Sequence, residues 1–244
     1  MQRYKLHIAY DGKPYSGWQI QPNAPSIQQT IENALTTLLK KPTAVHGSGR
    51  TDAGVHAHKQ VAHFDAPLLD TFRIKRSLNG LLPATIRILT LEKTDPDFHA
   101  RFSAKGKIYH YHLHLDPVLN PFKNGYCYHV RAPFNYPLLT QGIPYFIGTK
   151  DFAAFTNQSA IQNRTSIRTI YRLDPIPEPG GLRLEFEGNG FLYKMVRNIV
   201  GTLLDIAADK LKPAEIPKIM ETRDRRSAGR AAPAHALFLH EVLY

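Results

Sequence analysis

The chain has 244 residues, 43% of them hydrophobic, which suits one large domain or two small ones with a real core. Lysine and arginine total 31 against 20 acids, so the net charge is +11 and the pI about 9.7. The single cysteine excludes an intramolecular disulfide, and no apolar run suits a signal peptide or membrane span. We therefore expect a cytoplasmic protein with no membrane association and a polyanionic partner, although a solvated basic surface would carry the same charge.

The first third of the chain is predicted to be an α+β unit. Large apolar or aromatic side chains occupy every second position over residues 4–10, which is typical of a strand. Ser26 and Gln29 have the spacing of a capping box before a run of apolar residues at helical spacing, and Pro42 ends that helix. The next predicted elements are a strand over 60–64, a helix over 72–78 that stops at Gly80, and a strand around 86–90.

Asp95-Pro96-Asp97 is the predicted boundary between an N-terminal α+β half, 1–97, and a C-terminal α+β half, 98–244. Strict alternation over 107–115 predicts a strand at the start of the second half. The later predicted elements are a helix over 136–146, a loop over 159–164, strands near 167–173 and 182–186, a helix opened by 188–190 and a final strand over 237–243. Both halves are therefore expected to mix helices and strands.

The stretch 47–57, Gly-Ser-Gly-Arg-Thr-Asp-Ala-Gly-Val-His-Ala, combines three glycines with one acid. That acid, Asp52, is the only one between Glu32 and Asp65, and Arg50 precedes it by two residues. The stretch is not a phosphate-binding P-loop, because no Gly-Lys-Ser/Thr follows, and the position of its third glycine does not fit a dinucleotide fingerprint. A lone carboxylate in a basic, glycine-rich turn points to work on an anionic polymer, whereas the ordinary alternative is a structural turn.

Three histidines, His110, His112 and His114, share one face of the strand predicted over 107–115. Such a face could approach a metal ion, but one strand cannot surround the ion, and no acid or cysteine is close in sequence. A partly solvated histidine face is the expected alternative. Tyr109 lies on the opposite face, where it either packs in the sheet or stacks on a nucleic-acid base.

Arg197 lies within an apolar run of helical spacing, so it either binds an acidic or phosphate group or extends from the edge of the core into solvent. The sequence does not say whether Asp52 is its partner. Two basic groups, Arg73–Arg76 and Arg223–Arg226 with Arg230, are candidate phosphate contacts or solvated faces.

Several motifs, read together and in order, resemble the tRNA pseudouridine synthase A family over most of the chain. The matching segments are 17–23, 49–57, 98–104, 109–111, 188–201 and 232–234. The stretch 156–167 matches the family's tRNA-contacting loop only loosely, and 168–170 recovers the pattern. The resemblance implies an isomerase that converts uridines 38 to 40 of the tRNA anticodon arm to pseudouridine.

The resemblance also implies roles for individual residues. Asp52 would be the nucleophile, Tyr109 would stack on the target uracil, Arg197 would pair with Asp52 and Arg50 would help to extrude the base. The residues expected to contact RNA are Phe98, His99, Ala100, Arg101 and Phe102. The implied molecule is a homodimer of chains with two similar α+β halves and largely antiparallel sheets around a central cleft, with no metal or organic cofactor.

The reaction suits a single carboxylate. Cleavage of the N1–C1′ bond develops positive charge at C1′, which an ionised Asp52 would stabilise or attack, and Arg197 nearby would keep it ionised. Attack at C1′, attack at C6 of uracil and proton removal at C2′ all remain open. Three other functions also remain open: an RNA-binding module without turnover, a metal-dependent nuclease that uses the histidines, and an enzyme acting on free nucleotides.

Overall fold

The computed structural model describes residues 1–157 and 165–244 and divides into two compact units. The first unit is Met1–Lys105 with Phe238–Tyr244, and the second is Gly106–Leu237. The units differ from the predicted halves because 98–105 and the C-terminal residues join the first unit. Two contacts explain this difference: Arg3 Nη1 donates to the carbonyl of Phe98 at 3.0 Å, and the C-terminal strand runs parallel to a strand of the first unit. Each unit is described by itself below.

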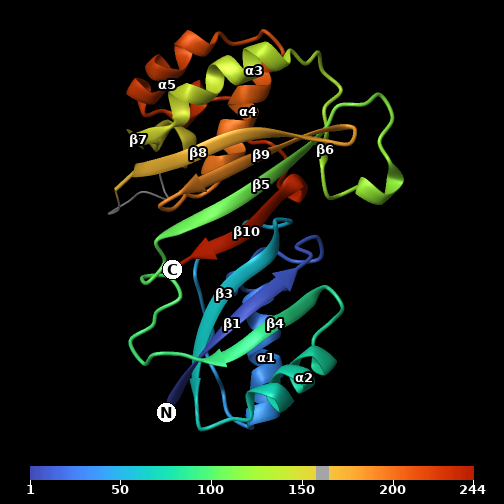
Figure 1. Cartoon of the computed structure of the whole chain (residues 1–244), viewed down its shortest axis with the longest axis vertical. Coiled ribbons are helices and arrows are strands. Elements are labelled where there is room, and N and C mark those ends of the chain that lie inside the picture. The colour runs from blue at the N-terminus through green and yellow to red at the C-terminus, as the bar shows by residue number, and fades with distance from the viewer. Residues whose placement is uncertain (158–164) are drawn as a thin grey trace. The chain divides into compact units, whose positions relative to one another are not determined.

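The first unit is a sheet with two helices. Its elements are β1 (Gln2–Tyr10), α1 (Ile27–Leu39), β2 (His46–Gly47), β3 (His56–Ala66), α2 (Thr71–Leu81), β4 (Ile86–Lys93) and β10 (Leu237–Leu243). The strand order is β4-β1-β3-β10, with β1 antiparallel to both β3 and β4, and β2 beside β3. Figure 1 shows both helices on one face of this sheet. Alternation in β1 buries Tyr4, Leu6 and Ile8 completely.

Local sequence explains most of these boundaries. The Ser26 hydroxyl accepts the backbone N–H of Gln29 and caps α1, whose buried face is built from apolar residues at helical spacing. The helix ends at Leu39, shortly before Pro42. The prediction that Gly80 stops α2 is wrong, because the helix continues to Leu81. Gly80 is an ordinary helical residue, and a Cβ added to it would meet no atom within 4 Å outside the nearby backbone of the helix.

The second unit combines an antiparallel sheet with helices. Its elements are β5 (Gly106–His114), η1 (Pro121–Lys123), β6 (Tyr128–His129), α3 (Tyr136–Gly142), η2 (Ile143–Phe146), β7 (Gly148–Asp151), η3 (Ala153–Phe155), β8 (Ile167–Glu178), β9 (Gly181–Gly188), α4 (Met195–Ala207), η5 (Pro213–Glu215), α5 (Ile216–Thr222), η6 (Arg225–Ser227) and η7 (Ala234–Ala236). The order β5-β9-β8-β7 is antiparallel throughout, and β6 runs parallel to β5. In Figure 1, α3, α4 and α5 gather on one side of this sheet.

Two predicted helices of the second unit differ in detail. The helix expected over 136–146 is an α-helix to Gly142 and a 3-10 turn beyond it, where Pro144 lacks the N–H that a continued α-helix would use. The glycine-rich residues 188–190 do not open a helix directly, because α4 begins only at Met195. The loop predicted over 159–164 lies outside the described residues.

The expected α+β class with largely antiparallel sheets is confirmed in both units. The strands predicted over 107–115 and 237–243 are found as β5 and β10. Among the described residues, no helix has the length and apolar character that crossing a bilayer requires.

Candidate active site

The loop that carries Asp52 connects β2 to β3, and Gln60 holds the first half of this loop in place. The Ser48 hydroxyl bonds to Oε1 of Gln60 at 2.6 Å, and Nε2 of Gln60 donates to the carbonyl of Gly49 at 3.0 Å. Both side chains are fully buried. A buried amide that satisfies two groups of one loop fixes that loop against the strand behind it, because breaking either bond would strand a polar atom.

The second half of the loop is held by the segment that follows β1. The backbone N–H of Trp18 donates to the carbonyl of Thr51 at 3.1 Å, and the hydroxyls of Tyr10 and Thr51 lie 2.9 Å apart. Burial raises the pKa of Tyr10 well above its ordinary value, so its phenol stays neutral. The N–H of Val55 donates to the carbonyl of Asp52 at 3.1 Å and closes the turn. Asp52 is half-buried at the tip of a backbone that is fixed on both sides.

Gly17 lies against this loop and leads to a stability prediction. Its φ is +95°, and a Cβ there would lie 2.5 Å from the carbonyl oxygen of Thr51. We expect Gly17→Ala to lower the free energy of unfolding by about 1–3 kcal/mol, because the folded state would carry both the strain of the positive φ and the clash with the backbone of Thr51. Gly80→Ala is the matched control, because it has open space within α2 and should stabilise by about 0.5–1 kcal/mol. Urea denaturation measures both, and equal shifts would contradict the close approach.

The segment 98–102 is anchored by buried groups of the first unit. The N–H of Ala100 donates to Nδ1 of His63 at 3.2 Å, and the Tyr244 hydroxyl donates to the carbonyl of Ala100 at 2.6 Å. Nδ1 of His99 accepts the backbone N–H groups of Arg101 and Phe102 at 3.1 and 3.3 Å. These bonds leave Arg101 and Phe102 on the outside of the turn, where the Phe102 side chain is 76% exposed. A cation and an aromatic ring presented together suit contact with RNA.

The anchoring histidine predicts a pH dependence of stability. Burial, reinforced by the positive neighbours His99, His46 and Arg3, lowers the pKa of His63 from 6.5 to about 4. As the pH falls, His63 therefore becomes protonated in the unfolded chain before it does in the folded protein. Its contribution to the free energy of unfolding is complete above pH 6.5, declines as the pH falls toward 4 and changes no further below pH 4. Denaturation midpoints between pH 7.5 and 4 should show this decline.

His63→Gln keeps a hydrogen-bond acceptor but removes the titration, so the decline with pH should be smaller in that variant. His129→Gln, in the second unit, is the matched control and should keep the decline of the wild type. An unchanged decline in His63→Gln would assign the effect to other groups.

Tyr109 lies in β5 of the second unit and is 8% exposed. It is paired across the sheet with Phe186, and its ring meets that of Phe191 edge to face, with centroids 5.2 Å apart. Phe191 comes from the glycine-rich segment between β9 and α4. That arrangement holds the ring orientation of Tyr109, which a stacking platform needs.

Arg197 lies in the first half of α4 and is half-buried. Its Nε donates to the carbonyl of Ala232 at 2.7 Å, and the N–H of Ala232 donates to the carbonyl of Arg197 at 3.0 Å. This reciprocal pair holds the guanidinium plane. The predicted pairing of Arg197 with Asp52 joins residues of different units and stays a prediction.

The histidine face of β5 differs from the expected solvated surface. His110 and His114 are buried, with 7% and 5% exposure, so the prediction is wrong for both of them. His112 is partly exposed, and its Nδ1 lies 2.8 Å from Glu178, a residue that the sheet brings from β8. A carboxylate distant in sequence therefore pairs with this face, which the chain order did not indicate.

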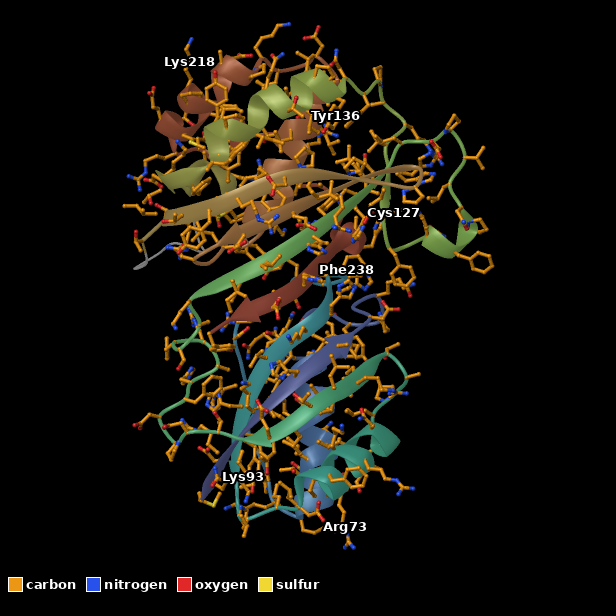
Figure 2. The ribbon with its side chains drawn as sticks, in the orientation of Figure 1. Arg73, Lys93, Cys127, Tyr136, Lys218 and Phe238 are labelled. Atoms are coloured by element: carbon orange, nitrogen blue, oxygen red, sulfur yellow. The ribbon has the colours of Figure 1, made fainter. Side chains whose placement is uncertain are left out.

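The basic groups fall into two kinds. Arg73, labelled in Figure 2 on α2, has an 84% exposed side chain and remains a candidate phosphate contact. Arg225 is structural instead, since it donates to the side chain of Asn198 at 2.9 Å and to the carbonyl of Ala228 at 3.1 Å. Arg226 is exposed but bonds to Asp224 at 2.7 Å.

Asp52, Arg50 and the segment 98–102 all belong to the first unit, and Arg50 is exposed. Tyr109 and Arg197 belong to the second unit. Sequence reasoning missed the residues that hold these groups in place, such as Gln60 and Tyr10. No motif marks their bonds: Gln60 lies 11 and 12 residues after the loop residues that it binds, and Tyr10 lies 41 residues before Thr51.

Comparisons with known proteins point to one family. A family model described as tRNA pseudouridine synthase matches residues 7–103 and 143–244. The chain is similar to proteins named tRNA pseudouridine synthase A, or A 1, among them the following three. Identity is 53% for Protochlamydia amoebophila, 46% for Chlamydia felis and 43% for Bacillus cereus; each match covers 100% of this chain, and 97%, 92% and 99% of the respective relative.

A chain in the solved structure titled "Crystal Structure of a Cbf5-Nop10-Gar1 Complex" is 16% identical, with a TM-score of 0.34. The match covers 83% of this chain and 54% of that one. A score at this level informs neither fold nor function.

Proposed function

This chain belongs to the tRNA pseudouridine synthase family, and from that premise we propose that it is an isomerase that converts uridine to pseudouridine at positions 38, 39 and 40 of the tRNA anticodon stem-loop. The observation that carries the proposal is Asp52, a single acid at the tip of a loop fixed on both sides, within the matched residues 7–103. We assign Asp52 as the nucleophile.

The proposed reaction leaves the composition of the RNA unchanged. The N1–C1′ bond breaks, the uracil turns, C5 bonds to C1′, the C5 proton leaves to solvent and N1 gains a proton. Asp52 attacks C1′ or C6, or removes a proton at C2′, and each route needs an ionised carboxylate. We assign Arg197 as the partner of this carboxylate, as the family resemblance implies. The fixed loop supports any of these routes, because reacting groups must be held in position.

The target base has to leave the helical stack before it reacts. Extruding a base costs a few kcal/mol, which contacts with the protein must offset. We assign Tyr109 to stack on the extruded uracil and Arg50 to occupy the space it leaves. We assign the RNA contacts of this segment to the exposed Arg101 and Phe102, with Phe98 and His99 beside them. Ala100, which was also expected to contact RNA, is completely buried and anchors the segment instead. The net charge of +11 supports this assignment, since phosphate contacts provide much of the affinity for RNA.

The test is tritium release from tRNA that carries C5-labelled uridine and lacks the modification. We expect release with the wild-type protein, followed by mapping of the new pseudouridines to positions 38, 39 and 40. Binding without release would favour an RNA-binding module, and strand scission sensitive to EDTA would favour a nuclease. Release from free uridine monophosphate would favour a nucleotide enzyme.

The family resemblance further supports a cytoplasmic homodimer that needs no metal or organic cofactor. Light scattering coupled to size exclusion tests the dimer, since a mass near twice 27.6 kDa is expected. Turnover that persists after dialysis against EDTA tests independence from metal.

A further inference from the structure

The segment 229–233 in the second unit is fastened along α4. Its first residue, Gly229, donates its N–H to the Thr202 hydroxyl at 2.9 Å, and Thr202 is completely buried. Close approach is possible because Gly201 has no side chain: a Cβ there would lie 1.7 Å from the carbonyl oxygen of Arg230. The segment therefore lies directly against the backbone of the helix, with no room to shift toward it.

The other end of the segment is fastened to the sheet. The Tyr111 hydroxyl donates to the carbonyl of Pro233 at 2.9 Å, and Tyr111 is fully buried in β5. Burial raises the pKa of Tyr111 well above its ordinary value, so the phenol is protonated and able to donate at neutral pH. Ala232, whose carbonyl accepts from Nε of Arg197, is the residue directly before Pro233.

The hydrogen bond from Tyr111 to Pro233 therefore affects the orientation of the Arg197 guanidinium. If Pro233 were released, the carbonyl of Ala232 could rotate, and the bond that orients Nε of Arg197 would weaken. Because a guanidinium is planar, the direction of Nε sets the direction of both Nη groups. Tyr111 also lies two residues after Tyr109 and on the same face of β5. A single strand therefore carries Tyr109 and the anchor for Arg197.

We propose that Tyr111 is a positioning residue for the isomerisation: through Pro233 and Ala232 it holds the guanidinium of Arg197 in its working orientation. The inference rests on the proposed function, in which Arg197 is assigned as the partner of Asp52. Thr202 serves the same purpose at the other end of the segment, because it fastens Gly229.

The experiment is a double-mutant cycle with tritium release from tRNA as the readout. Tyr111→Phe removes one hydroxyl and keeps the ring, and we expect kcat to fall about tenfold while KM for tRNA stays within twofold. On an Arg197→Ala background the same substitution should change kcat less than twofold, because the group it positions is gone. Additive effects in the cycle would overturn the proposal.

Matched variants separate positioning from a loss of folding. Tyr171→Phe removes a phenol hydroxyl from a half-exposed side chain of β8 and should leave kcat unchanged. Thr202→Val should reproduce the loss, and Thr202→Ser, which keeps the hydroxyl, should restore activity. If Tyr111→Phe fails to fold, Thr202→Val and Thr202→Ser are compared on the Arg197→Ala background instead. The proposal again predicts that they differ less than twofold in kcat there, and additive effects would overturn it.

The outcomes also distinguish this inference from the proposed function. No tritium release by the wild-type protein would refute the proposed function. An active wild type and a slow Arg197→Ala, combined with full activity of Tyr111→Phe and Thr202→Val, would refute the positioning role alone.

Discussion

Replacing Asp52 by alanine is expected to lower the rate of tritium release from C5-labelled tRNA by about 10⁴-fold or more, a loss typical of removing a catalytic carboxylate. Affinity for tRNA should stay within about twofold, because phosphate contacts rather than one acid provide it. Single-turnover release with excess enzyme measures the chemistry, and filter binding measures the affinity. Asp52→Asn, which keeps the shape and removes the charge, should be nearly as slow.

Asp97→Asn is the matched control, since Asp97 is an exposed acid of the same unit. It should turn over at the rate of the wild type. Release by Asp52→Ala at the rate of the wild type would remove Asp52 from the reaction. Loss of both release and binding would point instead to an altered loop, and comparison with Gly17→Ala, which disturbs the same backbone, would identify that cause.

Removing the ring of Tyr109 is the second large effect that we expect. Stacking of a base on an aromatic ring contributes about 1–3 kcal/mol, so Tyr109→Ala should lower kcat/KM for tRNA by roughly 10–100-fold. Tyr109→Phe keeps the ring and its edge-to-face contact with Phe191. Tight binding of tRNA is therefore expected in the phenylalanine variant, and any reduction of its turnover would report on the hydroxyl alone.

The control for stacking is Tyr136→Ala, at an exposed aromatic residue at the start of α3. Figure 2 labels this residue, and its removal should leave kcat/KM unchanged. Equal activity of Tyr109→Ala and the wild type would show that Tyr109 does not stack on the substrate. Its role would then be packing in the core, with which its 8% exposure is also consistent.

The elements of the fold were predictable wherever a periodic pattern was long enough. The alternation in β1 and β5 and the capped apolar run of α1 are local signals, and these elements appear where expected. Gly80 misled the prediction for α2, because a glycine lowers helix propensity by only about 1 kcal/mol and packing against β4 overrides it. Glycines 188 and 190 precede α4 without starting it.

The extent of each unit was not predictable from composition. Asp95-Pro96-Asp97 has the residues of a boundary, yet the chain remains in the first unit to Lys105. The reason is a set of distant bonds: Arg3 and His63 hold 98–100 against the first sheet, and β10 returns to lie beside β3. Pairing between residues so far apart has no local sequence signal.

By itself, the sequence determined the chemistry available to this protein: one acid in a basic, glycine-rich loop, an aromatic ring on a strand, an arginine in an apolar helix, and motifs of a single enzyme family. Only the tertiary structure decided how these groups are held. The hydroxyls of Tyr10 and Thr51 meet across 41 residues, and Tyr111 reaches Pro233 across 122. Such bonds depend on which strands and loops become neighbours, and that is settled by burial of the whole core rather than by any local pattern.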